Sequence, residues 1–339
     1  MKKIVSSLVV GCAIMVFASW QYRLLCVLLC ILINKSWMLH RTSKAVYRIL
    51  CWSLVVGIFC AIPNYFQRGR TQLHYISKSG DYRHAPVPVY LANALLPEKE
   101  VCNLGIKAVA LLGGGVHGVG GSLLDDARED FWKGKLIGLY SSYNNLSHPG
   151  SFAFGQLWNE LKHSGYDAIY ITRPRHYDEG REYPVVFFCH GYLGSWELYQ
   201  GILDELDGCY VVSIGTKDLS GIFSYQDINR IFSKYMPYLE KQGCGIDKSH
   251  IHLIGLSNGG SAADVALSSF SGKFKTITYM STPCNVVKYS KSKVLMVCGG
   301  KDREGFGIRN TKKKLERCGT HCSILYDEGE NHYMLVRKK

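Results

Sequence analysis

A G-x-S-x-G motif at residues 255–259 limits the fold of this chain more than any other feature. It joins the β-like run His250–Leu256 to the helical run that begins near Gly260. In a tight strand-to-helix turn the central serine, Ser257, is held at the apex, and bulky residues two positions before or after it would collide with neighbouring backbone. The motif therefore predicts a nucleophile elbow. An ordinary glycine-rich loop with a capping serine is the alternative.

Beyond Arg70, short β-rich runs alternate with amphipathic helical stretches. Strand, helix and strand in this order are typical of a parallel sheet covered on both faces. The predicted fold class is therefore α/β, with a mostly parallel, doubly wound sheet. The predicted strands are Leu73–Ser77, Ala168–Thr172, Val185–His190, Tyr210–Gly215, His250–Leu256, Thr276–Ser281, Val294–Gly299 and Ser323–Tyr326. The predicted helices are Ser195–Asp207, Gln226–Gln242, Gly260–Phe270 and Ile308–Cys318.

The base and the acid that a serine nucleophile needs follow the elbow in the chain. The run Val294–Gly299 ends in glycines and is followed by Asp302, which places a carboxylate at the carboxyl end of a strand. His332 lies in the loop after the last predicted strand. We therefore expect His332 to take the proton of Ser257, and Asp302 to orient and stabilise the imidazole. The competing candidates for the acid are Asp327, Glu328 and Glu330.

A second loop predicts the donors that would hold a developing negative charge on oxygen. An apolar β-like run leads into an H-G-x-x-G loop at residues 190–194. Gly191 allows the backbone to approach a bound carbonyl group closely. We therefore expect the backbone amides of Tyr192 and Asn258 to form an oxyanion hole. His190 precedes the serine in the chain, so we expect it to brace the loop rather than to act as the base.

Together, the elbow, the loop, the strand-end aspartate and the late histidine resemble the α/β-hydrolase fold. Within that fold, the H-G-x-x-G loop and the following stretch Trp196–Tyr199 are similar to the group of platelet-activating-factor acetylhydrolases, dienelactone-hydrolase-like esterases and bacterial cutinase-like polyesterases. The similarity covers about residues 183–332. The elbow carries Leu256 and Asn258 where many members have His and a different residue. The resemblance implies a serine esterase of the carboxylesterase or lipase type that needs no cofactor and no metal.

The first 66 residues are dominated by apolar side chains and contain no Asp or Glu. They hold three apolar runs, each near the lower limit of the about 17–25 residues that span a hydrocarbon core: Ile4–Trp20, Leu24–Leu39 and Ile49–Phe66. The first run fits either a signal peptide or a spanning helix, and its cleavage would leave the chain attached. We therefore expect residues 1–66 to anchor the chain in a lipid bilayer through two to three transmembrane helices, and residues 67–339 to form the hydrolase domain.

Basic residues near the apolar runs predict the orientation of the chain. Arg23 stands alone in the first short loop, whereas four basic residues crowd the second loop between Lys35 and Arg48. With three spans, the positive-inside rule places the second loop in the cytoplasm and everything after Phe66 on the other side. Two spans would reverse this orientation. We expect a membrane protein whose catalytic domain is extracytoplasmic.

The net charge of +13, from 40 Lys and Arg against 27 Asp and Glu, raises the question of an anionic partner. Part of this charge flanks the apolar runs, where anionic lipid headgroups would meet it. The rest of the chain has no zinc-finger spacing and no RNP-type strand, which are signatures of nucleic-acid binding. We expect a membrane surface as partner and no nucleic acid. The sequence leaves the oligomeric state open.

The stretch from about residue 103 to residue 163 is the part of the hydrolase domain that the sequence predicts least, within a poorly defined region 67–165. Its glycine-rich run at residues 113–121 lacks the Lys-Ser/Thr of a phosphate-binding loop. We therefore expect a flexible loop or a helix hairpin and no nucleotide.

Thirteen cysteines without a C-x-x-C motif give no disulfide framework. Cys318 and Cys322 are spaced so that they could pair, but several other cysteines fall in apolar β-like runs, where Cys acts as a small hydrophobic residue. We expect free thiols.

The spacing of two strands predicts the size of the acyl group. Hydrolases of long-chain lipids often carry a helical lid after the sixth strand, but here that strand ends near Thr282 and the seventh begins near Lys293, which leaves only about ten residues between them. The site should therefore be open, with walls from Leu219–Tyr225 and Tyr192–Trp196, and should prefer short acyl esters, acetyl to butyryl. Two alternatives to a membrane-anchored esterase remain: an acyltransferase or thioesterase with the same triad, and a catalytically inactive membrane scaffold.

Overall fold

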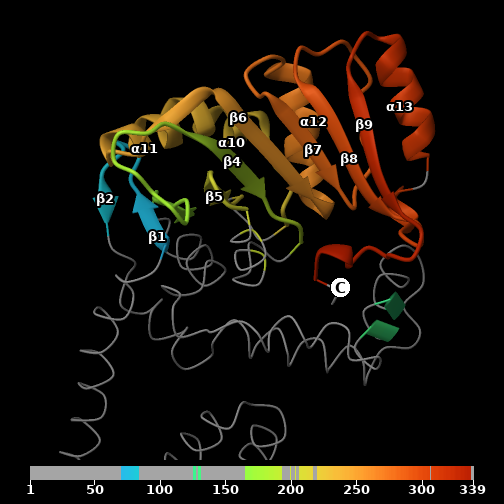
Figure 1. The fold of residues 1–339 in the computed structure, drawn as a ribbon, viewed down its shortest axis with the longest axis horizontal. Coiled ribbons are helices and arrows are strands. Elements are labelled where there is room, and N and C mark those ends of the chain that lie inside the picture. The colour runs from blue at the N-terminus through green and yellow to red at the C-terminus, as the bar shows by residue number, and fades with distance from the viewer. Residues whose placement is uncertain are drawn as a thin grey trace, which may run out of the picture.

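The computed structural model describes part of the chain, drawn as coloured ribbon in Figure 1. The described residues are 70–83, 125–126, 129–130, 165–192, 199, 203, 206–216, 220–305 and 307–336. The predicted membrane segment 1–66 and most of the stretch 103–163 lie outside them. Within the described residues, no helix combines the length and the apolar character needed to cross a bilayer.

Nine strands of the described chain form one sheet. Their order is β2-β1-β3-β5-β4-β6-β7-β8-β9 (Figure 1), and every pair from β5 to β9 is parallel. β3 runs antiparallel to both of its neighbours, and β2 runs antiparallel to β1. The strands are β1 (Thr71–Ile76), β2 (Tyr82–Arg83), β3 (Asp167–Thr172), β4 (Tyr183–Cys189), β5 (Tyr210–Ile214), β6 (Ile246–Leu256), β7 (Thr276–Met280), β8 (Lys293–Gly299) and β9 (Cys322–Asp327).

The mostly parallel α/β sheet predicted from the sequence is confirmed, and each of the eight predicted strands is present. The sequence missed β2, which is only two residues long and adds no hydrophobic run. It also placed the start of β6 four residues too late, because β6 begins at Ile246 with polar residues that do not read as a strand. The reversal of β3 was not predicted either, since a parallel and an antiparallel strand in mid-sheet can carry the same apolar run.

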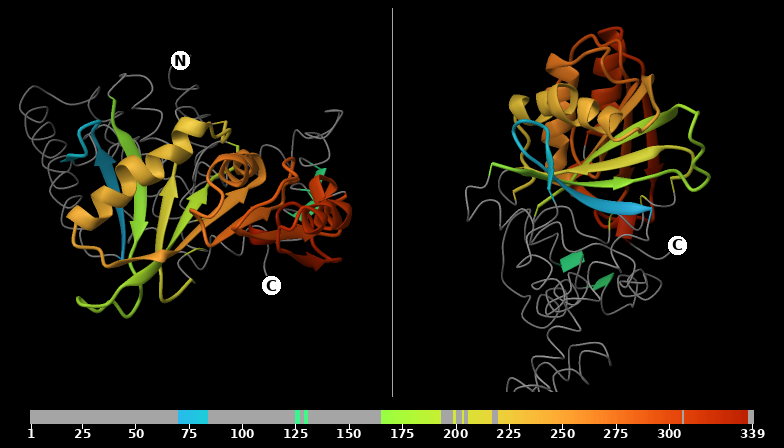
Figure 2. Two further views of the ribbon diagram at one scale, coloured as in Figure 1. Left: turned by 90° about the horizontal axis from the view of Figure 1, so that it is seen from above. Right: turned by 90° about the vertical axis from the view of Figure 1, so that its left-hand side faces the viewer.

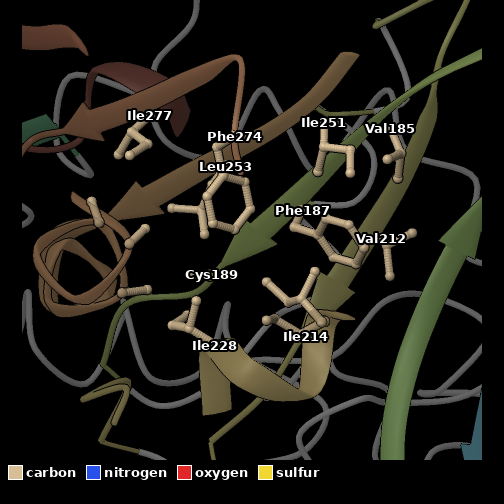
Figure 3. Close-up of a cluster of buried hydrophobic side chains, with 14 of the residues drawn as sticks. Val185, Phe187, Cys189, Val212, Ile214, Ile228, Ile251, Leu253, Phe274 and Ile277 are labelled. Carbon is tan, nitrogen blue, oxygen red and sulfur yellow. The ribbon is translucent and has the colours of Figure 1, made fainter. Parts of the chain in front are cut away.

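The central strands are buried on both faces, as their continuous apolar runs predict. Along β4, Phe187 belongs to the larger core cluster and Phe188 to a smaller one, because successive side chains of a strand point to opposite faces. β5 alternates in the same way, with Val212 in the larger cluster and Val211 in the smaller one. Figure 3 shows the larger cluster, where β4, β5, β6 and β7 meet the side chains that cover them.

Four helices of the described chain contribute side chains to the larger core cluster: α10 (Tyr225–Arg230), α11 (Met236–Lys241), α12 (Gly260–Ser269) and α13 (Ile308–Arg317). They lie on one side of the sheet (Figure 1; Figure 2 gives two further views), and α13 packs against β9. The predicted helix Gln226–Gln242 is instead two α-helices joined by the π-helical turn η2 (Ile231–Tyr235). Pro237 lies at the start of α11 and has no N–H to continue the α-helical pattern, which favours the interruption. The predicted helix Ser195–Asp207 lies mostly outside the described residues.

The parallel pairing brings the carboxyl ends of the six strands from β5 to β9 in the sheet order to one edge of the sheet. The register pairs Cys189 with Gly255 and Leu256 with Met280, and farther along it pairs Gly299 with Asp327. Loops that follow β4, β6, β8 and β9 therefore emerge side by side. This edge is where the residues of the predicted site lie.

Candidate active site

Ser257 stands at a strained turn between β6 and α12. It is the first residue of a short 3-10 turn, η3 (Ser257–Gly259), and its φ of 51° lies in the left-handed region that non-glycine residues rarely adopt. Such strain persists only where the surrounding structure holds it, and it clusters at functional sites. The tight strand-to-helix turn that the motif predicts is present, while the role of Ser257 as a nucleophile stays a prediction.

The flanking glycines of the motif are required by close backbone contacts. A Cβ on Gly255 would collide with the carbonyl oxygen of Gly259, and a Cβ on Gly259 would collide with the carbonyl oxygens of Cys189 and His190. A larger residue at Gly255 would force the turn itself open, and a larger residue at Gly259 would push the elbow away from the end of β4. The turn can therefore form only with small residues on both sides of Ser257.

Ser257, His332 and Asp302 are in contact in the order expected of a triad. His332 Nε2 lies 3.0 Å from Ser257 Oγ, and His332 Nδ1 lies 3.2 Å from each carboxylate oxygen of Asp302. An ionised carboxylate can only accept hydrogen bonds, so Nδ1 carries the proton and donates it toward Asp302. Nε2 is then left to accept the hydrogen bond of the Ser257 hydroxyl. The imidazole is thus held in the tautomer that a base needs.

The aspartate and the histidine are withdrawn from water, while the serine is more open. Asp302 is 3% exposed and His332 is 9% exposed, whereas Ser257 is half-buried. Burial of the pair lowers the effective dielectric around it, which strengthens the attraction between the carboxylate and a positive charge on the imidazole. The more accessible serine can still meet a substrate.

Two loops are locked together to hold this pair. The Gly300 amide donates to the Asp327 carbonyl at 2.7 Å, and the Lys301 amide donates to the Glu330 carbonyl at 2.9 Å. A Cβ on Gly299 would collide with that Glu330 carbonyl. The glycines that end β8 therefore let the loop after β9 pack directly on the loop that carries Asp302.

Among the candidates for the acid, Asp302 is the one whose carboxylate contacts the histidine. Asp327 accepts a hydrogen bond from the Gly329 amide at 2.9 Å and is exposed, so it serves the turn after β9. Glu328 is exposed as well. The structure thus brings together the three residues that the sequence singled out.

One predicted oxyanion-hole donor, Asn258, follows the serine in the chain, and the other, Tyr192, belongs to a loop whose backbone passes close to the serine. Asn258 follows Ser257 directly in η3, just before α12, and its side-chain amide donates to the Ser220 carbonyl at 2.9 Å. On the other side, a Cβ on Gly191 would lie 3.1 Å from Ser257 Cβ, so the backbone leading into Tyr192 passes close to the serine. The role of the two amides as an oxyanion hole stays a prediction.

His190 is buried and holds its loop from inside. Its Nδ1 lies 2.6 Å from the Gly191 carbonyl, and its Nε2 lies 3.4 Å from the Thr216 amide nitrogen. Since the carbonyl accepts and the amide donates, the ring bridges the end of β4 to the end of β5. Its edge also packs against Phe223. These contacts agree with the predicted bracing role.

An acidic segment next to the triad was missed at the sequence level. Asp126 and Asp130 are helical residues of the poorly predicted region, and Asp130 accepts a hydrogen bond of 2.8 Å from the Asn331 side chain. Burial, followed by the negative charges of Asp126, Asp130 and Asp302, raises the pKa of Tyr333 to about 12. The run of acids at residues 125–130 gave no signal, because a charged run usually marks a solvated helix face.

The cysteines of the described part are free thiols. Cys318 and Cys322 are free thiols, as predicted, and burial raises the pKa of Cys322 to about 11. Within the described ranges, no group of three or more His, Cys, Asp or Glu side chains is placed to hold a metal ion.

No family model and no curated protein sequence matches the chain. Among solved structures, a thermostable esterase is 18% identical over 49% of this chain and 52% of its own, with a TM-score of 0.40. An acylaminoacyl peptidase of Pyrococcus horikoshii is 17% identical over 49% of this chain and 36% of its own, with a TM-score of 0.39. A structure of fungal esterases from Rhizomucor miehei is 13% identical over 51% of this chain and 74% of its own, with a TM-score of 0.43.

The chain spans about half the length of the first of these structures and about a third of the second. Similarity of this degree carries no conclusion about substrate or mechanism. The mostly parallel sheet, the elbow after β6 and the chain order serine, aspartate, histidine are the features of an α/β-hydrolase fold. The narrower group that the sequence resembles finds no support among these structures.

Proposed function

We propose that the chain is a serine hydrolase that cleaves carboxylic ester bonds through an acyl-enzyme. Ser257 is the nucleophile, His332 the general base and Asp302 the residue that orients the imidazole. The observation that supports this most is the continuous contact from Ser257 Oγ through both nitrogens of His332 to the carboxylate of Asp302. A serine hydroxyl needs such a base to act as a nucleophile near neutral pH.

In the first half of the proposed reaction, Ser257 Oγ attacks the ester carbonyl while its proton passes to His332 Nε2. The carbonyl oxygen becomes negative, and the backbone amides of Tyr192 and Asn258 donate hydrogen bonds to it. The tetrahedral intermediate collapses, and the leaving alkoxide takes the proton back from His332. Asp302 stabilises the imidazolium that exists between these two steps.

In the second half, water takes the place of the alcohol. His332 removes a proton from the water, the hydroxide attacks the acyl carbon, and the ester bond to Ser257 breaks with return of the proton to Oγ. In each half, His332 passes the proton that it removes from the attacking oxygen to the leaving oxygen, and no atom changes its oxidation state, so no redox partner is needed. We propose that the reaction uses no cofactor and no metal.

An acyltransferase or a thioesterase would use the same three residues, since these enzymes differ in the acceptor or the leaving group. The inactive-scaffold alternative is disfavoured by the intact contacts of all three side chains. Labelling of the purified chain with a fluorophosphonate probe tests for a reactive serine. Release of p-nitrophenol from p-nitrophenyl acetate in water then tests for hydrolysis, and acceptor alcohols or thioester substrates separate the alternatives.

We expect short acyl esters to be the better substrates. The connection from β7 to β8, residues 281–292, contains no helix, so it supplies no helical lid. The side chains of Tyr192 and Ile222 are 67% and 64% exposed. Their loops approach each other closely, because a Cβ on Gly221 would collide with the backbone of Gly191. A small apolar wall of this kind fits a short or flat acyl group.

We expect kcat/KM to be highest for p-nitrophenyl acetate to butyrate and at least about tenfold lower for palmitate. This factor corresponds to about 1.4 kcal/mol of binding free energy that an open site does not supply to the long acyl chain. Esters of two to sixteen carbons, assayed below their aggregation limit, measure it. Rates that climb from butyrate to palmitate would contradict the prediction and indicate an apolar tunnel.

The membrane location is a separate proposal, supported by the apolar runs and their basic flanks. We propose that residues 1–66 anchor the chain and that the hydrolase domain is extracytoplasmic. Paired reporters fused after Phe66, one active only outside the cytoplasm and one active only inside, measure the orientation. Activity of the cytoplasmic reporter alone would overturn the orientation, and recovery of the chain without membranes would overturn the anchor.

A further inference from the structure

A buried carboxylate reaches the histidine loop from a distant part of the chain. Asp130 is 2% exposed, and its Oδ2 accepts a 2.8 Å hydrogen bond from the Asn331 side-chain amide, 201 residues later. The described residues around Asp130, green in Figure 1, lie beside the loop that follows β9. Burying an ionised group is costly unless it is hydrogen-bonded, so this contact is worth more than a surface hydrogen bond.

Asn331, which precedes His332, links the Asp130 carboxylate to the backbone that follows His332. Its own side chain is 6% exposed. While its amide group donates to Asp130, its side-chain oxygen accepts a hydrogen bond from the Tyr333 amide at 3.0 Å. Its carbonyl oxygen also accepts from the Met334 amide at 3.1 Å. Asn331 therefore spans His332 from the residue before it to the residue after it.

The histidine loop is also held by the loop that follows β8. The Lys301 amide donates to the Glu330 carbonyl, so the loop that carries Asp302 holds the histidine loop from one direction. Asp130 holds it from the other. With both contacts in place, the His332 ring has little freedom to move away from Ser257 or Asp302.

We propose that Asp130 is a positioning residue, which acts through Asn331 to keep the His332 imidazole in line with Ser257. This inference rests on the proposed hydrolase function and adds to it a residue outside the triad. It assigns a role to one described residue of the stretch that the sequence leaves undefined: Asp130 supplies a buried hydrogen-bond acceptor for the histidine loop. Asp130 makes no proton transfer of its own.

Kinetics of four variants in the full-length chain test the proposal. Asp130→Ala and Asn331→Ala are each expected to lower kcat about 10- to 100-fold with KM within about twofold, since a base displaced by about 1 Å costs up to about 10² in rate. The double variant should be no worse than either single variant, because both remove the same link. Asp130→Asn should keep kcat within about fivefold of the wild type, since its amide oxygen still accepts from Asn331.

The rescue by asparagine separates a hydrogen bond from a charge effect. If Asp130→Asn lost as much kcat as Asp130→Ala, the charge rather than the link would matter, and the proposal would be wrong. Single-variant losses that multiply in the double variant would overturn it too. The matched control is Asn285→Ala, which removes an amide that donates to the Asp264 carboxylate at 3.0 Å behind the elbow. Its kcat should stay within about threefold of the wild type.

Hydrogen exchange tests the link without any assumption about the reaction. In Asp130→Ala, the peptide that contains the Tyr333 and Met334 amides should exchange at least about tenfold faster than in the wild type, because its acceptor Asn331 is released. In Asp130→Asn it should exchange as in the wild type. Peptides from β8 serve as the fold control and should not change.

Hydrogen exchange also distinguishes a failure of the positioning role of Asp130 from a failure of the proposed hydrolase function. A wild-type chain without probe labelling or ester hydrolysis would refute the hydrolase function, while exchange would still decide whether Asp130 holds the histidine loop. Unchanged exchange in Asp130→Ala, with β8 intact, would overturn the positioning role whatever the activity.

Discussion

Replacing Ser257 with alanine is expected to abolish fluorophosphonate labelling and to lower ester hydrolysis by a factor on the order of 10³ or more. The hydroxyl is the atom that forms the acyl-enzyme, and the remaining side chains can only bind substrate and polarise water. The domain should stay folded, because Ser257 is half-buried and alanine leaves its backbone in place. Rates with p-nitrophenyl acetate, together with the thermal midpoint of both proteins, measure the result.

The matched control is a serine of the same helix start that does not face the histidine. Ser261 donates to the Asn258 carbonyl at 2.8 Å, so Ser261→Ala removes a hydroxyl from the elbow region without touching the triad. We expect it to keep full probe labelling. Labelling of Ser257→Ala at the wild-type level would show that another residue is the nucleophile and would refute the assignment.

Replacing Asp302 with asparagine is expected to lower kcat by about 10³- to 10⁴-fold while the fold is retained. Asparagine has nearly the same shape, but its amide group can donate to His332 Nδ1 and so favour the tautomer whose proton faces Ser257. In that tautomer Nε2 cannot accept the serine proton. KM should change little, because Asp302 is 3% exposed and does not face the substrate.

Glu328→Gln is the control for this change, since it neutralises an exposed acid on the loop after β9 that also competed for the role at the sequence level. We expect its kcat within about twofold of the wild type. A large loss in Glu328→Gln, with Asp302→Asn near wild type, would move the acid to the loop after β9 and overturn the assignment made here.

Much of the site could be predicted from the sequence because its residues follow strands. A parallel sheet brings every strand's carboxyl end to one edge, so Ser257, Asp302 and His332 needed only to follow three apolar runs to be placed together. Gly255 and Gly259 indicated the turn itself, because few turns other than an elbow require glycine at both positions.

The parts that the sequence missed depend on contacts between distant segments. Nothing local to Asp130 indicates that it is buried, because its partner Asn331 lies 201 residues away. The reversed direction of β3 likewise follows from which neighbours it pairs with rather than from its own residues. The π-helical interruption η2 between α10 and α11 depends on a single residue, Pro237, which changes the long apolar pattern of this stretch very little.

β9 lies at the border of the described sheet, and this position affects which part of the structure unfolds first. β9 pairs with β8 alone, and Leu325 in its centre is 60% exposed, so this strand contributes far less burial than β4 or β6. Fraying of a border strand requires much less free energy than unfolding of a core. Because the loop that carries His332 follows β9, we expect heat or denaturant to separate His332 from Ser257 while the centre of the sheet is still intact. If the proposed function holds, the loss of activity under stress should precede the unfolding of the central strands.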